Sequence, residues 1–194
     1  MKYNELKKIK KNYFNYQDIA RILAISEASA KVLSARYVKQ DYLIRLKRNF
    51  YILKERWSNL SNLEKMEIAN ILQVPSYLSL MTALSYYEIT TQLQRDFFES
   101  ISLQRTFSRE IEGTIFNYSK IKQEYYFGFR KEKNIFIALP EKALIDSLYL
   151  SFHGKYHLDI SSLDFRKIDL KIFNELIQVY PDKFVSYVRR IVNE

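Results

Sequence analysis

The sequence of 194 residues contains no cysteine and only three glycines and three prolines. The lack of cysteine excludes a disulfide framework, a thiolate zinc site and a cysteine nucleophile. The low content of glycine and proline argues against low-complexity linkers. No apolar run approaches the roughly 18 residues of a membrane-spanning helix. No apolar stretch follows the first residues, so we expect no signal peptide. These absences fit a cytoplasmic protein.

Hydrophobic residues, by contrast, make up 47% of the chain and aromatic residues 15%, with 16 tyrosines and 13 phenylalanines. This apolar content is too high for a disordered chain. A chain of this length forms either one large domain or two small ones. We therefore expect enough bulky side chains for two modest cores.

The excess positive charge is confined to one part of the sequence. The whole chain holds 31 basic and 22 acidic residues, a formal net charge of +9. Residues 1–56 hold 14 of the basic and 5 of the acidic residues, which gives +9, and the remaining 17 basic and 17 acidic residues cancel. This asymmetry predicts one domain that meets a polyanion and one that does not.

The N-terminal residues show the spacing of three helices followed by a β-hairpin. Ser26 is a good N-cap for the third helix and follows a tight turn at Ala24 and Ile25. Two β-rich runs then flank a polar tip that contains Asn49. The predicted helices span about residues 3–11, 17–23 and 27–39, and the strands span 41–46 and 50–53. This order predicts a basic winged helix-turn-helix domain over residues 1–56.

The third helix has one face for packing and an opposite face that is free to enter a DNA groove. At 100° per residue, Ala30, Leu33 and Tyr37 fall together and dock on the first two helices. The opposite face and its flanks are predicted to bind DNA and consist of Ala28, Ser29, Lys31, Val32, Ala35, Arg36 and Lys39. Small residues allow close approach to bases, and the basic side chains reach base edges or phosphates. Ser26 and the N–H groups at the helix start are predicted to bind a phosphate.

The hairpin tip is also basic. It contains Arg45, Lys47, Arg48 and Asn49, which we expect to lie along phosphates or in the minor groove. The alternative is that these are solvated turn residues, but the charge asymmetry favours DNA contact. RNA binding would require exposed aromatic side chains for stacking, whereas a core role is favoured for the nearby tyrosines and Phe14.

The rest of the chain predicts a second domain. Residues 57–75 are expected to be a bridging helix, and Pro75 and Ser76 are expected to end it and start another helix through about Tyr87. Residues 76–194 are predicted to form an α+β domain, because β-rich runs between residues 97 and 139 precede further helical stretches. These runs indicate a small antiparallel sheet. The later helices are expected from Pro140 and at about 169–180 and 182–192. The predicted fold class is therefore α+β.

Residues 57–194 offer few candidates for catalysis or metal binding. His153 and His157 are spaced i, i+4, but Gly154 lies between them and no third ligand is near. Glu110 and Glu112 share a face of a predicted strand, without the lysine partner that a restriction-enzyme-type nuclease needs.

Two acidic residues of the predicted helix after Pro140 have ordinary explanations. Glu141 lies in its first turn and Asp146 at its middle, where interaction with the helix dipole or ion pairing is the default. We therefore expect no catalytic residue, no metal and no cofactor.

Three segments, in order along the chain, resemble a known family. Residues 16–20 (Tyr-Gln-Asp-Ile-Ala) through 42–51 look like the N-terminal winged helix of AbiEi-type antitoxins. Residues 75–87 (Pro-Ser-Tyr-Leu-Ser-Leu-Met-Thr-Ala-Leu-Ser-Tyr-Tyr) are similar to that family's inter-domain helix. Residues 140–146 (Pro-Glu-Lys-Ala-Leu-Ile-Asp) resemble its later proline-glutamate-x-alanine motif. The family's usual glycines in the turn and in the wing are replaced by Ala24 and Asn49, and Asn tolerates left-handed turns.

The resemblance implies a cytoplasmic antitoxin and transcriptional autorepressor of a bacterial toxin–antitoxin or phage abortive-infection pair. Its partners would be double-stranded DNA at inverted repeats of its own promoter and a nucleotidyltransferase-like toxin. The resemblance leaves direct contact with the toxin open. Two other functions also stay open on the sequence: a nucleic-acid-processing enzyme with an unrecognised C-terminal site, and a module that binds toxin through exposed apolar surface.

Overall fold

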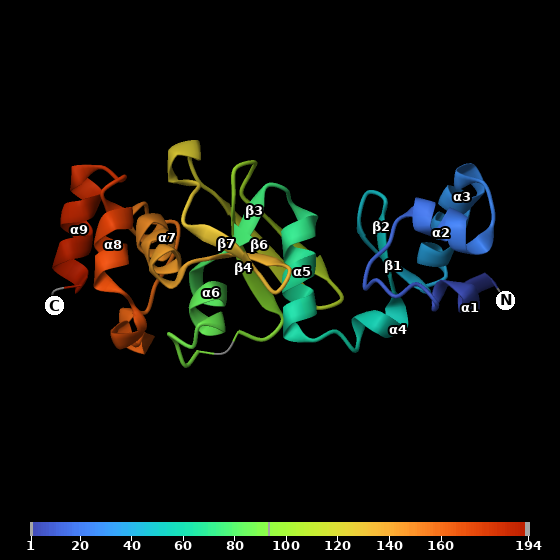
Figure 1. Ribbon diagram of the computed structural model, residues 1–194, viewed down its shortest axis with the longest axis horizontal. Coiled ribbons are helices and arrows are strands. Elements are labelled where there is room, and N and C mark those ends of the chain that lie inside the picture. Colours follow the sequence, from blue (N-terminus) through green and yellow to red (C-terminus); the bar gives the residue numbers. More distant parts are fainter. Residues whose placement is uncertain (1, 93, 193–194) are drawn as a thin grey trace. The chain divides into compact units, whose positions relative to one another are not determined.

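The computed structural model describes residues 2–92 and 94–192 and is an α+β structure (Figure 1). The chain divides into two compact units, residues 1–65 and residues 66–194, called unit 1 and unit 2 below. Unit 1 contains a two-stranded antiparallel sheet, and unit 2 contains a six-stranded mixed sheet. No helix in the described part of the chain combines the length and apolar character needed to cross a membrane.

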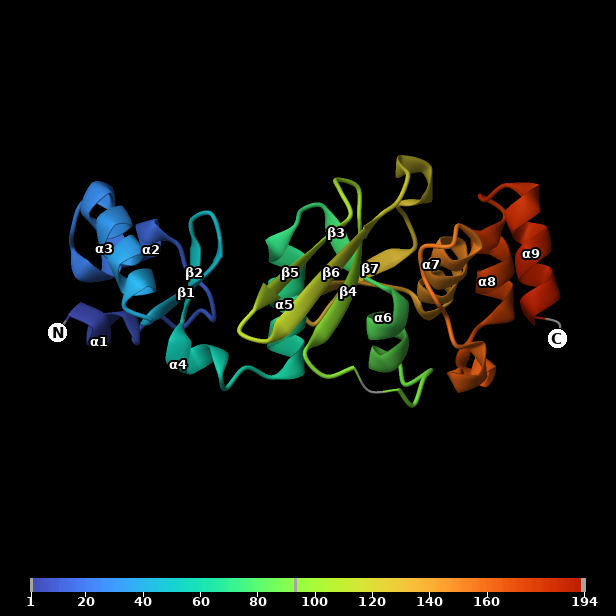
Figure 2. The same ribbon diagram turned by 180° about the vertical axis from the view of Figure 1, so that it is seen from behind.

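Unit 1 consists of three helices, a hairpin and a short fourth helix. The elements are α1 (Lys2–Leu6), α2 (Tyr16–Leu23), α3 (Glu27–Lys39), β1 (Leu43–Lys47), β2 (Phe50–Leu53) and α4 (Lys54–Trp57). Figures 1 and 2 show α2 and α3 packed side by side. The helix predicted over 3–11 is too long. It ends at Leu6, because the chain must leave the helix for Phe14 to reach Tyr51 and exchange two backbone hydrogen bonds with it.

Local capping fixes the two central helices of unit 1. Asn15 and Asp18 form a reciprocal capping box at the start of α2. The turn after α2 places Ala24 in the left-handed region, with φ +50°. The side-chain oxygen of Ser26 then accepts a hydrogen bond from the backbone N–H of Ser29, as predicted for the N-cap of α3. The predicted packing face of α3 is confirmed, since Ala30, Leu33, Ser34 and Tyr37 are buried.

The sheet of unit 2 is larger than predicted and is not purely antiparallel. Its strand order is β5-β6-β4-β3-β8-β7. The strands are β3 (Ser76–Leu78), β4 (Phe97–Ser102), β5 (Phe107–Ile111), β6 (Thr114–Lys120), β7 (Phe129–Glu132) and β8 (Ile135–Ala138). The pairs β3·β8 and β4·β6 are parallel, and the other three are antiparallel. The hairpins have local turn signals, whereas parallel neighbours meet only through long connections, which the sequence pattern does not reveal.

The central strand β3 lies in a segment that was predicted to be helical. The helix expected from Pro75 to Tyr87 is wrong for its first half, because Ser76–Leu78 pairs with β4 on one side and β8 on the other. The helix α6 begins only at Leu80 and ends at Tyr86. Within the region between residues 97 and 139 that was predicted to be β-rich, Gln123–Tyr125 is instead a 3-10 turn before β7.

Several helices pack against the sheet of unit 2. The helix α5 (Asn62–Leu72) contacts β6 through the hydroxyl of Tyr118, which donates to the carbonyl of Ala69. The other helices are α7 (Pro140–Phe152), α8 (Leu170–Ile177) and α9 (Asp182–Val192), with 3-10 turns at Ile160–Ser162 and Phe165–Lys167. Figures 1 and 2 show α7, α8 and α9 side by side, and α7 contacts both of the others. The helix α7 is buried on nearly all sides, from Glu141 to Leu148.

Candidate nucleic-acid interface

The outer face of α3 is exposed along its whole length. Of the twelve residues predicted to bind DNA, ten are exposed: Ser26, Ala28, Ser29, Lys31, Val32, Ala35, Arg36, Lys39, Arg45 and Arg48. The other two, Lys47 and Asn49, are partly buried in the hairpin. Val32 stands out because 71% of this apolar residue is exposed.

The exposed face of α3 is hollowed at its N-terminal half. The hollow measures about 430 Å³ and is lined by Ile25, Ala28, Ser29, Val32, Leu33 and Arg36. Four of these residues belong to the predicted DNA-binding set. Ala28 and Ser29 in this lining have short side chains, which allow a ligand atom to approach the helix backbone closely.

At the start of α3, the side chain of the N-cap residue Ser26 is hydrogen-bonded within the helix. The hydroxyl of Ser26 accepts from the N–H of Ser29 at 3.1 Å and donates to the hydroxyl of Ser29 at 2.9 Å. Glu27 follows in the first turn, where its carboxylate interacts favourably with the helix dipole. A phosphate at this end would therefore meet a capped helix and a nearby negative charge.

Four carboxylates of unit 1 pair with basic side chains away from the outer face of α3. Glu55 pairs with Lys7 at 2.7 Å and Glu5 with Lys8 at 2.7 Å. Asp41 pairs with Lys54 at 3.3 Å. Asp18 lies 3.7 Å from both Lys11 and Arg21.

Four cations on α3 and the hairpin lack such a partner. Within residues 2–92 and 94–192, no carboxylate lies within 4.0 Å of Lys31, Arg36, Lys39 or Arg48. Among the described residues, positive charge without a carboxylate partner therefore lies on the outer face of α3 and at Arg48 in the hairpin tip.

Two lysines of this region lie over aromatic rings. The Lys31 ammonium is 4.5 Å from the ring centroid of Tyr16 at the start of α2. The Lys47 ammonium is 4.6 Å from the ring of Phe50 in the hairpin, and burial lowers the pKa of Lys47. Such contacts restrict long side chains and leave the cation close to the surface.

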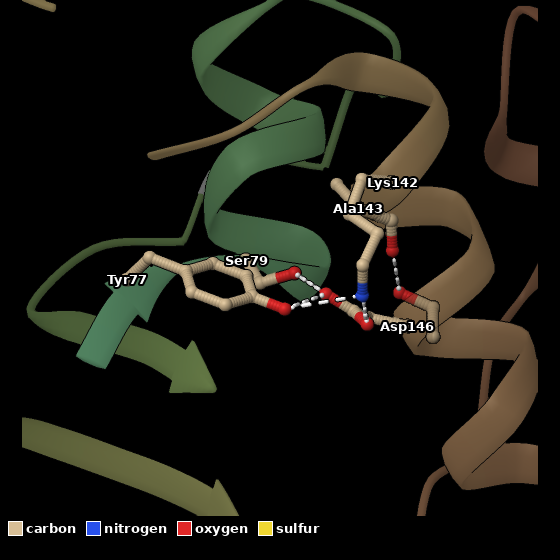
Figure 3. Close-up of polar contacts among 6 residues, drawn as sticks. Tyr77, Ser79, Lys142, Ala143 and Asp146 are labelled. Carbon is tan, nitrogen blue, oxygen red and sulfur yellow. Dashed lines mark hydrogen bonds and ion pairs between the residues drawn. The ribbon is translucent and has the colours of Figure 1, made fainter. Parts of the chain in front are cut away.

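A second group of polar residues lies buried in unit 2. Figure 3 shows Asp146 on α7 facing Tyr77 and Ser79 at β3. The Tyr77 hydroxyl donates to Oδ2 of Asp146 at 3.0 Å, and the Ser79 hydroxyl donates to the same oxygen at 2.8 Å. The Lys142 ammonium, one turn earlier on α7, pairs with Oδ1 of Asp146 and donates to the Tyr77 hydroxyl at 3.1 Å. All four residues are 0% exposed.

Burial dominates the electrostatics of this network. It lowers the pKa of the Lys142 ammonium and raises the pKa of the Asp146 carboxyl, while the attraction between the two opposes both shifts. The pKa of Tyr77 is raised by burial and then by the negative charge of Asp146. The pair is hydrogen-bonded and closed to solvent, so this arrangement holds β3 against α7.

Only part of this network was predictable from the sequence. Pairing was the default expectation for Asp146, and its partner is Lys142 at i, i+4. The roles of Tyr77 and Ser79 were missed, although both lie in a segment singled out by the resemblance. A signal for the pair was present, since Lys142 and Asp146 are charged residues four apart in an otherwise apolar helix.

The remaining candidates of unit 2 are dispersed. Glu141 accepts a hydrogen bond from the N–H of Asp169 at 3.0 Å and so supports the start of α8. His153 caps the end of α7, and His157 lies in the loop beyond it. The described part of the chain contains no group of three or more His, Asp or Glu residues arranged to hold a metal ion.

A scan against models of protein families found no match. A search of curated proteins also found no relative with a significant match.

Proposed function

We propose that unit 1 binds double-stranded DNA as a winged helix-turn-helix and that the protein is a sequence-specific transcriptional regulator. The order of two helices, a tight turn, a third helix and a hairpin supports this assignment. The backbone bridge from Phe14 to Tyr51 adds a strand-like segment to the edge of the hairpin, next to β2. The observation that carries the proposal is that, in the part of the chain the structure describes, no carboxylate pairs with Lys31, Arg36 or Lys39 on the exposed outer face of α3, or with Arg48 at the hairpin tip.

The proposed interface divides into a face that identifies bases and a face that holds the backbone. Lys31 and Arg36 lie on the exposed face of a helix of 13 residues, a length suited to the major groove. Val32, beside the hollow, offers methyl groups for contact with thymine. Lys47 and Arg48 at the hairpin contact phosphates, which position the domain without reading sequence.

Fluorescence anisotropy with labelled duplexes tests this proposal. The protein should bind its own upstream DNA more tightly than random duplex of equal length, with affinity that falls steeply as salt rises. Lys31→Ala and Arg36→Ala should relax the sequence preference. Arg48→Ala should weaken binding to all duplexes and make the salt dependence shallower by about one in slope. Equal affinity for both duplexes would refute the assignment as a sequence-specific regulator. Identical effects of all three variants would refute the division into base-reading and phosphate-binding residues.

We further propose, from the resemblance to AbiEi-type antitoxins, that the protein represses its own operon and counteracts a nucleotidyltransferase-like toxin. The buried network adds one supporting observation. The two segments of unit 2 that resemble the family, around residues 75–87 and 140–146, meet through Tyr77, Ser79, Lys142 and Asp146. The test is co-expression with the product of the neighbouring gene. Growth arrest by that product, relieved by this protein, is expected, and a harmless neighbour would refute the antitoxin role.

A further inference from the structure

The hairpin tip of unit 1 is joined to the start of α2 by a single asparagine. The side-chain oxygen of Asn49 accepts a hydrogen bond from the backbone N–H of Tyr16 at 3.1 Å. Its side-chain nitrogen donates to the amide oxygen of Gln17, also at 3.1 Å. Both polar ends of the Asn49 carboxamide are thus engaged within the protein, at a position that the sequence assigned to DNA contact.

The register of the backbone explains why an asparagine stands there. Phe14 and Tyr51 exchange two backbone hydrogen bonds, of 2.9 and 2.8 Å. In an antiparallel ladder the next hydrogen-bonded pair would be Tyr16 and Asn49. Asn49 has φ +61° because it forms the turn. Its side-chain oxygen accepts from Tyr16 in place of the backbone carbonyl, and asparagine tolerates the left-handed conformation.

The hydrogen bonds of Asn49 with Tyr16 and Gln17 are called the clamp below. Tyr16 connects this clamp to α3. Its backbone N–H binds Asn49, while its ring lies 4.5 Å from the ammonium of Lys31. One residue therefore contacts both the hairpin tip and a cation on the outer face of α3. The neighbouring residue at the tip, Arg48, is exposed.

We infer that Asn49 and Tyr16 are positioning residues that hold the hairpin tip and Lys31 in a fixed geometry, so that both meet DNA together. This inference rests on the proposed DNA binding of unit 1. Asn49 acts through Tyr16 and Gln17 and does not itself contact phosphate. Because the cation of Lys31 is held over a ring, less conformational freedom is lost when it binds a base or phosphate.

Double-mutant cycles on DNA affinity test the link between Tyr16 and Lys31. Tyr16→Leu removes the ring and should weaken binding to the upstream duplex by about two- to twelvefold, the cost of ordering one long side chain on binding. Lys31→Ala should then cost less in the Tyr16→Leu background than in the wild type. Tyr16→Phe keeps the ring and is the matched control, which should bind like the wild type. Additive effects, or a Phe variant as weak as the Leu variant, would overturn the link.

A second cycle tests the clamp. Asn49→Gly keeps the left-handed turn and removes the carboxamide, so the cost of Arg48→Ala should shrink in that background. A cost of Arg48→Ala that is the same with and without the carboxamide would refute the positioning role of Asn49.

Amide hydrogen exchange supplies a measurement that needs no DNA. In Asn49→Gly the amide of Tyr16 should lose protection, while the amide of Phe14, which bonds to a backbone carbonyl, should keep it. Retained protection at Tyr16 would overturn the clamp itself. Complete absence of DNA binding by the wild-type protein would instead refute the proposed function, and the exchange result would still decide whether the clamp exists.

Discussion

The buried pair of Lys142 and Asp146 leads to a prediction about stability and pH. Removing one partner of a buried, hydrogen-bonded ion pair leaves an uncompensated charge and costs about 3–5 kcal/mol. A unit of this size has a total stability of only about 6–19 kcal/mol. Asp146→Asn should therefore lower the free energy of unfolding by about 3–5 kcal/mol near neutral pH. Lys142→Met should cost somewhat less, because Tyr77 and Ser79 still donate to the carboxylate.

The two single variants should respond to pH in opposite directions. In Asp146→Asn the buried Lys142 has a lowered pKa, so the unfolded chain binds more protons than the folded one. Stability then rises with pH, between that lowered pKa and the unfolded value of about 10.4. In Lys142→Met the buried Asp146 has a raised pKa, so the folded chain binds more protons. The neutral Asp146 carboxyl therefore contributes to the free energy of unfolding in full below about pH 3.9. This contribution is lost as pH rises through the raised pKa of Asp146.

Urea unfolding followed by far-UV circular dichroism at about pH 5, 7 and 9 measures both effects. The control is Ser147→Ala on the same helix, which removes only a hydroxyl bonded to the carbonyl of Ala143. It should cost about 1 kcal/mol or less and show no such pH dependence. The double variant Lys142→Met/Asp146→Asn should cost less than the sum of the single variants. Parallel pH profiles for the two single variants, or costs below about 1 kcal/mol for both, would refute the account of a buried ion pair.

Three further predictions concern single residues. Ala24→Gly should stabilise unit 1 by about 0.5–1 kcal/mol in thermal unfolding, because glycine adopts the left-handed conformation without strain. The control Ala20→Gly within α2 should destabilise unit 1 by about 1 kcal/mol. A change of the same sign in both variants would contradict this prediction. Glu27→Gln should raise DNA affinity about two- to fivefold at low salt, measured by anisotropy, and an unchanged affinity would place DNA away from the start of α3. Gly128→Ala should destabilise unit 2 by about 1–3 kcal/mol, since Gly128 has φ +70° and an added Cβ would lie 3.0 Å from Lys142 Cγ. A urea midpoint equal to that of the wild type would contradict this prediction and show that the Lys142 side chain moves aside.

The elements of unit 1 could be predicted because their signals are local. Ser26 caps α3 through the N–H three residues later, and the spacing of Ala30, Leu33 and Tyr37 lies within the same helix. Asn49 marks the hairpin turn by its own conformation. Each of these features depends on residues that are close in sequence, which is where pattern-based inference is strongest.

The sheet of unit 2 could not be predicted in the same way. A proline followed by serine is a normal helix start, yet Ser76–Leu78 is a central strand because β4 and β8 flank it. Those partners lie about 20 and 60 residues further along the chain, and nothing in the segment itself reveals them. The same holds for Lys142, whose role depends on Tyr77, 65 positions away. Pairing between distant segments overrides local propensity at these positions.

Asn49 illustrates the limit within the candidate interface itself. A basic, polar hairpin tip predicted that every polar side chain there faces a ligand. Composition cannot tell whether a turn residue points outward or back toward its own domain, since that depends on the register that the Phe14–Tyr51 bridge imposes. In the structure Arg48 is exposed, while the carboxamide of Asn49 binds Tyr16 and Gln17. The two adjacent residues of the tip therefore have different roles. Arg48 carries a positive charge at the surface, whereas Asn49 anchors the tip to Tyr16, whose ring contacts Lys31.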